Sequence, residues 1–309
     1  MLIVSSVEQI KTPTAIALGN FDGIHQGHRI VLQPIIDAFA TSSQPHVYPS
    51  VVSFTPHPRE FFTGGKLQFL TPLTQKAELL SNLGIEQLIL LPFNRDLASL
   101  SPQQFVEQIL AKQLQATLIS VGSDFRFGYQ RKGTGEDLKR IAASFGIKVQ
   151  LNSLRQYQNR NHQQVRVSSS LIRQALSEGE IKTANAMLGR AYSLIGTVVT
   201  GQQLGRTIGF PTANLQLPAE KFLPRYGVYS VDVVLKQTVI KGVMNIGCRP
   251  TVAGEAPTIE VHLLNWSGDL YGQTLQVNLN EFLRPEQKFA SVEALKQQIN
   301  KDCQSVLNN

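Results

Sequence analysis

The first half of the chain alternates short apolar runs with segments of helical hydrophobic spacing. The apolar runs predict buried strands, because a strand covered on both faces carries apolar side chains at successive positions. They lie at residues 14–18, 51–54, 87–93, 116–122 and 147–151. Segments in which apolar residues recur every three or four positions predict helices. These segments lie at residues 27–39, 74–84, 102–114 and 136–146.

Five strands that alternate with helices indicate α/β architecture, a mainly parallel, doubly wound sheet. Residues at the predicted boundaries support this interpretation. Thr71 and Ser101 each precede a proline at the expected first position of a helix, and Ser101 with Gln104 matches a capping box. Gly84 and Gly146 end two of the helices. In such sheets ligands bind beyond the carboxyl ends of the strands.

The pattern changes twice further along. Residues 155–166 are polar and predict a loop or hairpin, and residues 168–189 return to helical spacing with Ser168 or Ser169 as the cap. After Gly189 the chain consists of short strand-like runs separated by turn residues. These runs lie at residues 193–201, 227–235, 239–247, 258–266 and 274–283.

The second half is therefore expected to form a small all-β domain. In its last strand Leu275, Val277 and Leu279 alternate with polar residues, which predicts one buried face. Several such strands favour an antiparallel barrel or sandwich, and residues 291–307 predict an amphipathic helix that packs on it. We place the boundary between the two domains at residues 1–188 and 189–309.

Composition is that of an ordinary globular protein. Of the 309 residues, 42% are hydrophobic and 17% are charged, and no apolar run reaches the ~18 residues that cross a bilayer. The first residues show no basic segment ahead of an apolar one, so we expect no secretory signal. Cys248 and Cys303 form no disulfide framework. We expect a cytoplasmic protein with free thiols and no membrane partner.

The net charge of +7 comes from dispersed Lys and Arg residues. A nucleic-acid-binding protein concentrates its basic residues in a stripe with interleaved aromatic residues, and this chain shows no such stripe. We therefore expect no nucleic-acid partner. A positive balance also suits a protein that handles polyphosphates.

The stretch "GNFDGIHQGH" from Gly19 places His25 and His28 at a strand-to-helix turn. Side chains three apart at the start of a helix share one face, and free backbone N–H groups there attract anions. The histidines alone are also compatible with surface or cap residues. Zinc is a third possibility, but no Cys/His cluster completes a tetrahedral site in the sequence.

Three further stretches lie near the ends of predicted strands or at the start of a helix. "SFTPHPREFF" holds His57 between two prolines, "GSDFRFGYQRKGTG" supplies Asp124, and "RVSSSLIR" opens a helix with hydroxyls, Arg166 and Arg173. Each stretch alone is compatible with a capped turn or a solvated loop. Their grouping at one edge of the sheet favours a phosphate site.

The second half carries two more polar groupings. Thr212 and Asn214 lie two residues apart in an extended segment, so their side chains face the same way and could hold a metal and a phosphate oxygen. Glu260 and His262 lie on the face opposite Val261 and its apolar neighbours. An exposed polar face of a barrel strand is the simpler alternative for this second pair.

Taken in order, the four N-terminal stretches resemble the adenylyltransferase module of the bacterial bifunctional riboflavin kinase/FAD synthetase family. The HxGH at residues 25–28 matches the signature of nucleotidyltransferases. "GFPTANL", "YGVYSV", "NIGCRPT", "EVHLL", "LYG" and "FLRPEQKF" resemble the riboflavin kinase module of the same family. The resemblance covers nearly the whole chain, in the family's domain order.

The resemblance implies roles for particular residues. His25 and His28 would contact the ATP phosphates with Asn20 nearby. The remaining ATP and pyrophosphate contacts of the first half would be Asp124, Arg166, Ser169, Ser170 and Arg173. The flavin would be seated by Pro56, His57 and Pro58.

In the kinase module, the resemblance implies that Thr212 and Asn214 bind Mg-ATP and that Glu260 accepts a proton from the ribityl 5′-hydroxyl of riboflavin. The remaining nucleotide contacts of this module would be Gly205, Arg206, Gly209 and Pro211. The glycines would let the backbone approach the phosphates.

The expected function is the ATP- and Mg²⁺-dependent conversion of riboflavin to FMN, followed by adenylation of FMN to FAD. The partners would be small-molecule flavins and ATP, and the sequence leaves the oligomeric state open. Two alternatives remain: a nucleotidyltransferase for another acceptor, such as nicotinate mononucleotide or phosphopantetheine, and a non-catalytic flavin- or RNA-binding protein.

Overall fold

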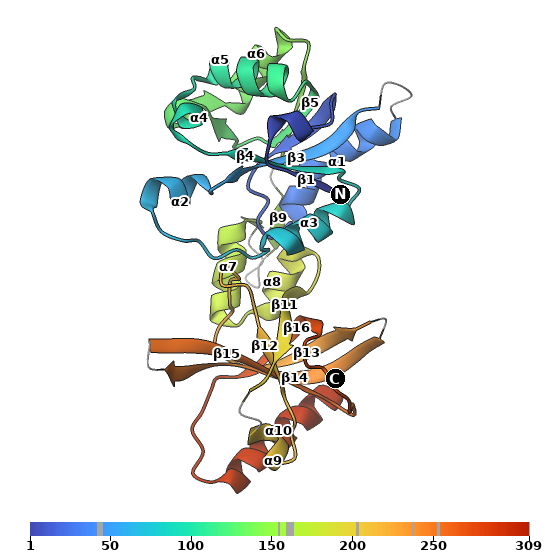
Figure 1. Cartoon of the computed structure of the whole chain (residues 1–309), viewed down its shortest axis with the longest axis vertical. Coiled ribbons are helices and arrows are strands. Elements are labelled where there is room, and N and C mark those ends of the chain that lie inside the picture. Colours follow the sequence, from blue (N-terminus) through green and yellow to red (C-terminus); the bar gives the residue numbers. More distant parts are fainter. Residues whose placement is uncertain are drawn as a thin grey trace. The chain divides into compact units, whose positions relative to one another are not determined.

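The chain forms two compact units, Met1–Ser169 and Ser170–Asn309, each described by itself below (Figure 1). The computed structural model describes residues 1–41, 46–153, 155–158, 164–201, 204–236, 238–251 and 254–308. Side chains of residues 41, 204, 206, 249–251 and 254–256 lie outside this description.

The first unit is built on a six-stranded sheet of order β1-β4-β3-β2-β5-β8 in which every neighbouring pair is parallel. Its strands are β1 (Leu2–Val4), β2 (Thr14–Leu18), β3 (Tyr48–Thr55), β4 (Gln87–Pro92), β5 (Ala116–Gly122) and β8 (Lys148–Asn152). The doubly wound α/β fold predicted from the alternating pattern is therefore confirmed.

Helices cover both faces of this sheet, because the central strand β2 is apolar on both sides. Ala15 and Ala17 pack with α1 and α3, whereas Ile16 and Leu18 pack with η2 and α6. The helical segments of this unit are η1 (Val7–Gln9), α1 (Gln26–Thr41), α2 (Pro58–Thr63), α3 (Leu73–Ser81), α4 (Arg95–Ser99), α5 (Pro102–Gln104), η2 (Phe105–Gln113), η3 (Tyr129–Arg131) and α6 (Gly135–Ala143). Burial on both sides explains the near-continuous apolar strands.

Most sequence-predicted boundaries of this unit agree with the structure. All five predicted strands form, and Ser101 with Gln104 makes the expected capping box at α5. Strand β1 was not predicted, because three residues at a sheet edge are too short to show a pattern. The first helical position expected at Pro72 was wrong, since Pro72 is the N-cap and α3 begins at Leu73.

Two small antiparallel ribbons complete the first unit. They are β6 (Arg126–Phe127) with β7 (Gly133–Thr134), and β9 (Gln156–Gln158) with β10 (Gln164–Arg166). The second ribbon confirms the hairpin that was one of the two alternatives for residues 155–166.

The helix expected over residues 168–189 is two helices, α7 (Ser169–Glu178) and α8 (Ile181–Leu188). The continuous helix was wrong because Gly179, between them, has a φ of +80°. Asn185 of α8 donates a hydrogen bond from Nδ2 to the Leu279 carbonyl at 2.8 Å, and its Oδ1 accepts the Tyr192 N–H at 2.7 Å. The second compact unit begins at Ser170 and therefore includes nearly all of α7 and α8. Our boundary between the domains at residue 188 stays a prediction.

The second unit is a closed antiparallel barrel of order β11-β12-β15-β14-β13-β16. The strands are β11 (Tyr192–Val199), β12 (Ala213–Gln216), β13 (Gly227–Leu235), β14 (Thr238–Thr251), β15 (Gly254–Leu263) and β16 (Thr274–Arg284), and one short helix, α9 (Leu204–Thr207), follows β11. Leu275, Val277 and Leu279 are fully buried, as their alternation predicted. The sequence left an antiparallel barrel and a sandwich open, and the structure shows the barrel.

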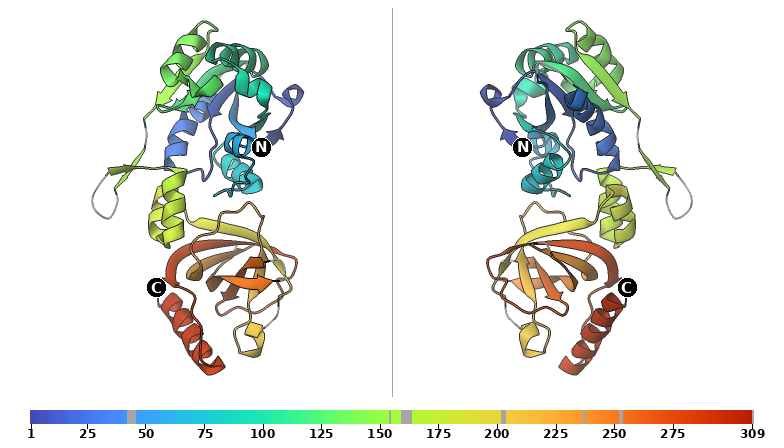
Figure 2. Two further views of the ribbon diagram at one scale, coloured as in Figure 1. Left: turned by 90° about the vertical axis from the view of Figure 1, so that its left-hand side faces the viewer. Right: turned by 90° about the vertical axis from the view of Figure 1, so that its right-hand side faces the viewer.

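The C-terminal helix α10 (Val292–Leu307) lies along the outside of the barrel (Figure 2). Its Cys303 and Val306 are buried in one cluster with Val228, Val243 and Leu264 of the barrel. Burial raises the pKa of the Cys303 thiol to about 11, and the neighbouring Asp302 carboxylate adds to this increase.

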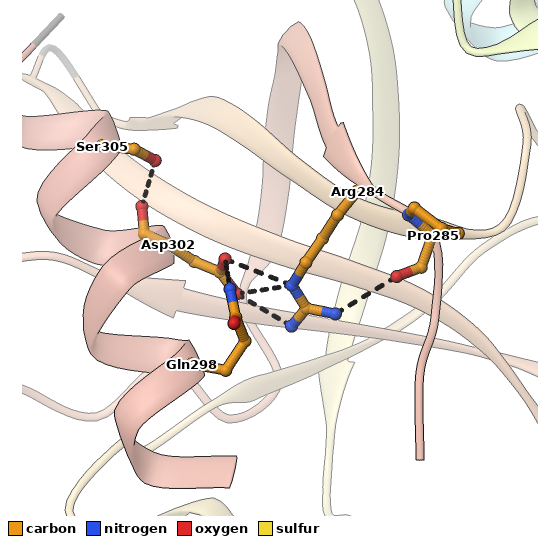
Figure 3. Close-up of polar contacts among 5 residues, drawn as sticks. All are labelled: Arg284, Pro285, Gln298, Asp302 and Ser305. Carbon is orange, nitrogen blue, oxygen red and sulfur yellow. Dashed lines mark hydrogen bonds and ion pairs between the residues drawn. The ribbon is translucent and has the colours of Figure 1, made fainter. Parts of the chain in front are cut away.

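An ion pair between Arg284 and Asp302 joins the end of β16 to α10 (Figure 3). Arg284 donates from Nε and Nη2 to the Asp302 carboxylate at 2.8–3.2 Å, and Gln298 Nε2 donates to the same carboxylate at 2.9 Å. The side chains are 17% and 7% exposed. Removal of either partner would leave a buried charge without its counterion.

We expect Asp302→Ala to lower the free energy of unfolding of the second unit by about 3 kcal/mol. Trp266 is the single tryptophan of the chain and lies in this unit, so its fluorescence in a urea titration measures the change. The matched control is Glu281→Ala, which breaks the exposed ion pair with Lys182 and should cost less than about 1 kcal/mol. Equal effects of the two substitutions would contradict this account.

Helix α6 begins with a capping box between Thr134 and Asp137. Asp137 N–H donates to Thr134 Oγ1 at 3.1 Å, and the Asp137 carboxylate accepts from the Thr134 N–H and hydroxyl and from Arg140. These hydrogen bonds lower the pKa of Asp137 to about 2, and the one from the Thr134 hydroxyl contributes most. Because the folded pKa lies below its usual value of 3.8, the stabilisation is present above pH 3.8 and is lost as the pH falls towards 2.

We expect Asp137→Asn to speed amide hydrogen exchange in α6 relative to the natural chain at pH 7. The difference should shrink as the pH falls from about 4 towards 2, because the natural carboxylate is then protonated as well. Mass spectrometry of the peptide covering residues 135–143 measures the exchange. Glu136→Gln in the same turn is the control, and a pH-independent difference for Asp137→Asn would refute the assignment.

Candidate functional site

The carboxyl edge of the parallel sheet brings the predicted first-half stretches of β2, β3 and β5 together. Strand β2 pairs with β3 on one side and with β5 on the other. The chain passes from β2 to β3 and β4 and then returns to the opposite side of β2 to form β5. Such a switch point opens a crevice at the carboxyl ends of the strands. The residues after β2 and β5 therefore border the expected ligand site.

His25 and His28 form a stacked pair at the start of α1. Their ring centroids lie 3.5 Å apart with the planes 15° from parallel, and His25 is 5% exposed while His28 is half-buried. His25 Nδ1 accepts the backbone N–H of His28 at 3.2 Å. We therefore assign the proton of the neutral His25 ring to Nε2, which makes that nitrogen a hydrogen-bond donor.

The turn that carries this pair has an unusual backbone. Phe21, Gly23 and Ile24 have φ values of 46°, 92° and 40°. A non-glycine residue in the left-handed region costs of order 1–3 kcal/mol, and a β-branched one is rare there. The surrounding structure must therefore hold the turn in place, and we call residues 19–25 the phosphate turn.

Hydrogen bonds from the segment just before α3, and one from Ser169, hold the phosphate turn. The Asp22 carboxylate accepts the N–H groups of Leu70 and Thr71 at 3.2 and 3.0 Å, and Thr71 Oγ1 accepts the Gly23 N–H at 2.9 Å. The Ser169 hydroxyl donates to the Asp22 carbonyl at 2.8 Å. Ser169 thus reaches this turn, although through the backbone of Asp22.

Sequence reasoning placed Thr71 at a helix start and did not connect it with the histidines. Lys76, on α3, was missed altogether: it donates from Nζ to the Asn20 carbonyl at 2.8 Å. No local pattern shows either contact, because about fifty residues separate the partners. Asn20 itself is exposed at the carboxyl end of β2.

Asp124 and Arg166 are brought together by β5 and β10. Their ion pair measures 2.6 Å, and each side chain is about half exposed. Such a pair contributes little to stability and leaves both groups accessible. Ser170 and Arg173 belong to the second unit, where the Arg173 guanidinium lies 5.8 Å from the centre of the Phe222 ring. Their predicted contacts with the first unit remain predictions.

His57 caps helix α2. Its Nδ1 accepts the Arg59 N–H at 3.0 Å, and its own N–H donates to the Glu60 carboxylate at 3.2 Å, a capping box with Pro58 at the first helical position. Pro56 is exposed next to it. The structure therefore gives His57 a local structural role and keeps its ring half-buried at the carboxyl end of β3.

An aromatic cluster beside His57 was missed by the sequence reasoning. Ring centroids of Phe54, Phe61 and Phe62 lie 5.3–5.8 Å from that of Phe93 in edge-to-face contacts. Phe62 is 70% exposed, so the face of its ring is accessible. Exposed aromatic rings at a ligand-binding edge can stack on a planar ligand.

On the barrel, Glu260 lies in a polar row on the outer face. It pairs in register with Asn214 of β12 on one side and with Asn245 of β14 on the other. Directly opposite residues on one face of an antiparallel pair have Cβ atoms about 5 Å apart. Val261 is fully buried inside the barrel, as its alternation with Glu260 predicted. Asn245 was not singled out because only the strand register shows its proximity.

A tight glycine-containing turn borders this polar row. Phe210 N–H donates to the Gly205 carbonyl at 2.8 Å, and a Cβ on Gly205 would collide with the Phe210 carbonyl oxygen. Gly209 has a φ of +91°, where glycine is favoured. The side chain of Arg206 lies outside the described residues. Only glycine thus fits the closest approach in this turn.

The segment after the turn is fixed by His262, whose Nδ1–H donates to the Pro211 carbonyl at 2.8 Å. Thr212 Oγ1 lies near the Cα of Gly205, and the Asn214 amide lies against Gly201. Together with the Glu260 carboxylate, these are the oxygen donors that Mg²⁺ prefers. Within the described ranges, His, Cys, Asp and Glu form no group of three or more suited to a metal.

The fold and these two sites define an enzyme class: a nucleotidyltransferase-type α/β unit combined with a barrel unit that carries a glycine turn and an acidic residue. A family model described as FAD synthetase matches residues 7–171, and one described as riboflavin kinase matches residues 188–309. The chain belongs to the family of bifunctional riboflavin kinases/FMN adenylyltransferases.

Curated relatives with this description agree in length and sequence. The Escherichia coli K12 protein is 39% identical over 93% of this chain and 90% of its own length. The Pseudomonas fluorescens protein is 39% identical over 92% and 89%, and the Listeria monocytogenes protein is 34% identical over 93% and 89%.

A solved structure also matches the whole chain. It is described as a macrolide-efflux protein from Streptococcus pneumoniae and is 30% identical in sequence to this chain. The match covers 100% of this chain and 99% of the other, with a TM-score of 0.86. Across the described parts of this chain, we find no helix with both the length and the apolar character that a membrane span requires.

Proposed function

We propose that the chain catalyses two consecutive ATP-dependent reactions, one in each unit. The barrel unit phosphorylates riboflavin to FMN, and the α/β unit transfers the adenylyl group of ATP to FMN, which yields FAD and pyrophosphate. The family assignment carries both activities. The single structural observation that best supports the second reaction is the stacked His25–His28 pair at the switch point of the sheet.

In adenylyl transfer, a phosphate oxygen of FMN attacks the α-phosphorus of ATP. A new P–O–P bond forms, the bond to the β-phosphate oxygen breaks, and pyrophosphate leaves. Negative charge gathers on the α-phosphate oxygens during attack, and N–H donors from His25 and His28 stabilise that charge more than they stabilise bound ATP. No covalent intermediate with the protein is needed.

Further contacts are proposed for the adenylyl-transfer site. Asn20, Asp124 and Arg166 border the nucleotide, and Ser169 supports the phosphate turn through its hydrogen bond to Asp22. Ser170 and Arg173 supply pyrophosphate contacts from the start of α7. We keep the functional boundary at residue 188 for this reason, although α7 groups with the barrel by its contacts.

The flavin is proposed to lie over Pro56, His57 and Pro58, with Phe62 as an additional stacking partner. Its isoalloxazine ring is planar and aromatic, and Phe62 of α2 offers an exposed ring that contacts Phe93, the residue after β4. The phosphate of FMN then points towards the phosphate turn.

In the kinase reaction, Glu260 accepts the proton of the ribityl 5′-hydroxyl as that oxygen attacks the γ-phosphate of ATP. Gly205, Arg206, Gly209 and Pro211 border the nucleotide phosphates, and Asn245 is placed to hydrogen-bond Glu260 or substrate. Thr212 and Asn214 would hold Mg²⁺, which neutralises polyphosphate charge when bound.

The wider setting stays part of the proposal. We propose a cytoplasmic enzyme whose partners are flavins and ATP, without nucleic acid. The rival acceptors nicotinate mononucleotide and phosphopantetheine would leave the barrel unit unexplained.

Purified chain incubated with riboflavin, ATP and Mg²⁺ should yield FMN and then FAD, which chromatography separates. Recovery of riboflavin alone, or of bound but unconverted flavin, would refute the function.

We expect His28→Ala to reduce FAD formation by about 10²- to 10⁴-fold, whereas FMN still accumulates, because the substitution removes a transition-state donor. Glu260→Gln should reduce FMN formation by a similar factor and leave adenylation of supplied FMN intact. His46→Ala and Glu293→Gln are controls at exposed positions. Equal loss of both activities in either variant would contradict separate sites.

We expect Phe62→Ala to raise the KM for FMN in adenylation by about 5- to 10-fold through the lost stacking, with the KM for ATP unchanged. Steady-state kinetics with each substrate varied in turn measures this. Phe145, a partly exposed ring on the same unit, provides the control Phe145→Ala. An unchanged KM for FMN in Phe62→Ala would remove Phe62 from the flavin site.

A further inference from the structure

Lys76 is a buried cation directed into the phosphate turn. Its side chain is 8% exposed, and its Nζ donates to the Asn20 carbonyl at 2.8 Å. Burial lowers the pKa of Lys76, and the negative charge of Asp22 acts in the opposite direction. A lysine is rarely this buried unless a partner compensates its charge, so its presence here calls for a physical reason.

The position of Lys76 on α3 supplies that reason. Thr71, which lies just before the N-cap of the same helix, holds both Asp22 and Gly23. Asn20 lies near the beginning of the phosphate turn and His25 ends it, so Lys76 fixes the turn near its beginning while Thr71 fixes its middle. Phe21, which has a left-handed backbone, lies between these anchored residues, and Ile24, which has one too, directly follows them.

We propose that Lys76 is a positioning residue for adenylyl transfer. Its ammonium group fixes the Asn20 carbonyl and, with Asp22, holds the backbone that presents His25 and His28 to the α-phosphate. This inference rests on the proposed adenylyltransferase function of the first unit. The positive charge is required as well as the length of the side chain, because a neutral group neither balances Asp22 nor donates as strongly to a carbonyl.

The test uses Lys76→Ala in the full chain, with propylammonium chloride as the probe that replaces the deleted atoms. We expect the kcat of FMN adenylation to fall ~10- to ~100-fold, since small misplacements of catalytic groups have effects of this size. The KM for ATP should change much less. Propylammonium should restore part of the kcat, whereas 1-propanol, its neutral counterpart, should not.

Two comparisons separate positioning from folding. Riboflavin kinase activity in the same chain reports the second unit, and hydrogen exchange in β2 and α3 reports the first. Lys76→Met, which keeps the side-chain length, should lose adenylation while both readouts stay unchanged. Lys112→Met removes an exposed lysine of the first unit and should leave both activities as they were.

The outcomes are distinguishable. A natural chain that makes no FAD from FMN and ATP would refute the proposed function itself. A natural chain that makes FAD, with Lys76→Ala or Lys76→Met equally active, would overturn the inference. Equal rescue by 1-propanol, or loss of protection in β2 and α3 in both variants, would assign Lys76 to packing alone and would overturn it too.

Discussion

The proposed chemistry of the first unit depends on how the phosphate turn is held. Three residues of that turn have positive φ, and two of them are not glycine, so an isolated peptide would not adopt this backbone. Asp22 stabilises this unfavourable backbone, because its carboxylate accepts hydrogen bonds from the backbone N–H groups of Leu70 and Thr71. The hydrogen bonds of the turn thus offset strain, and the stacked histidines are placed as a consequence.

The proposed site residues of the second unit are positioned in a different way. Glu260 and its neighbours Asn214 and Asn245 lie on adjacent strands of a closed barrel, so the strand register fixes their spacing without a strained backbone. Only the glycine turn beside them depends on special residues, since Gly205 approaches the Phe210 carbonyl too closely for a side chain. The proposed site of the first unit is therefore built on a loop, and that of the second unit is built on strands.

Much of the fold was predictable from periodicity. Buried strands and amphipathic helices give strong patterns, and the five first-unit strands and α10 were found from them. Short elements gave no pattern: β1 and β12 have too few residues, and the break between α7 and α8 depends on the φ of Gly179. The sequence also left barrel and sandwich open, since strand closure depends on long-range pairing.

The candidate site was predictable where chemistry is local. The histidines three residues apart and the alternation around Glu260 both identify side chains that share a face. Thr71, Lys76 and Asn245 were missed because their partners lie far along the chain and meet only in the folded sheet or barrel. His57 caps helix α2, and its part in seating the flavin stays a prediction.

The central claim is that the phosphate turn presents two imidazoles to a nucleotide phosphate. A crystal structure of the chain with FMN and a non-hydrolysable ATP analogue tests it most directly. The account predicts that a ring nitrogen of each of His25 and His28 lies within hydrogen-bond distance of the α-phosphate oxygens, with the backbone of residues 19–25 unchanged. A nucleotide bound elsewhere in the first unit, with both imidazoles facing apolar side chains, would contradict it.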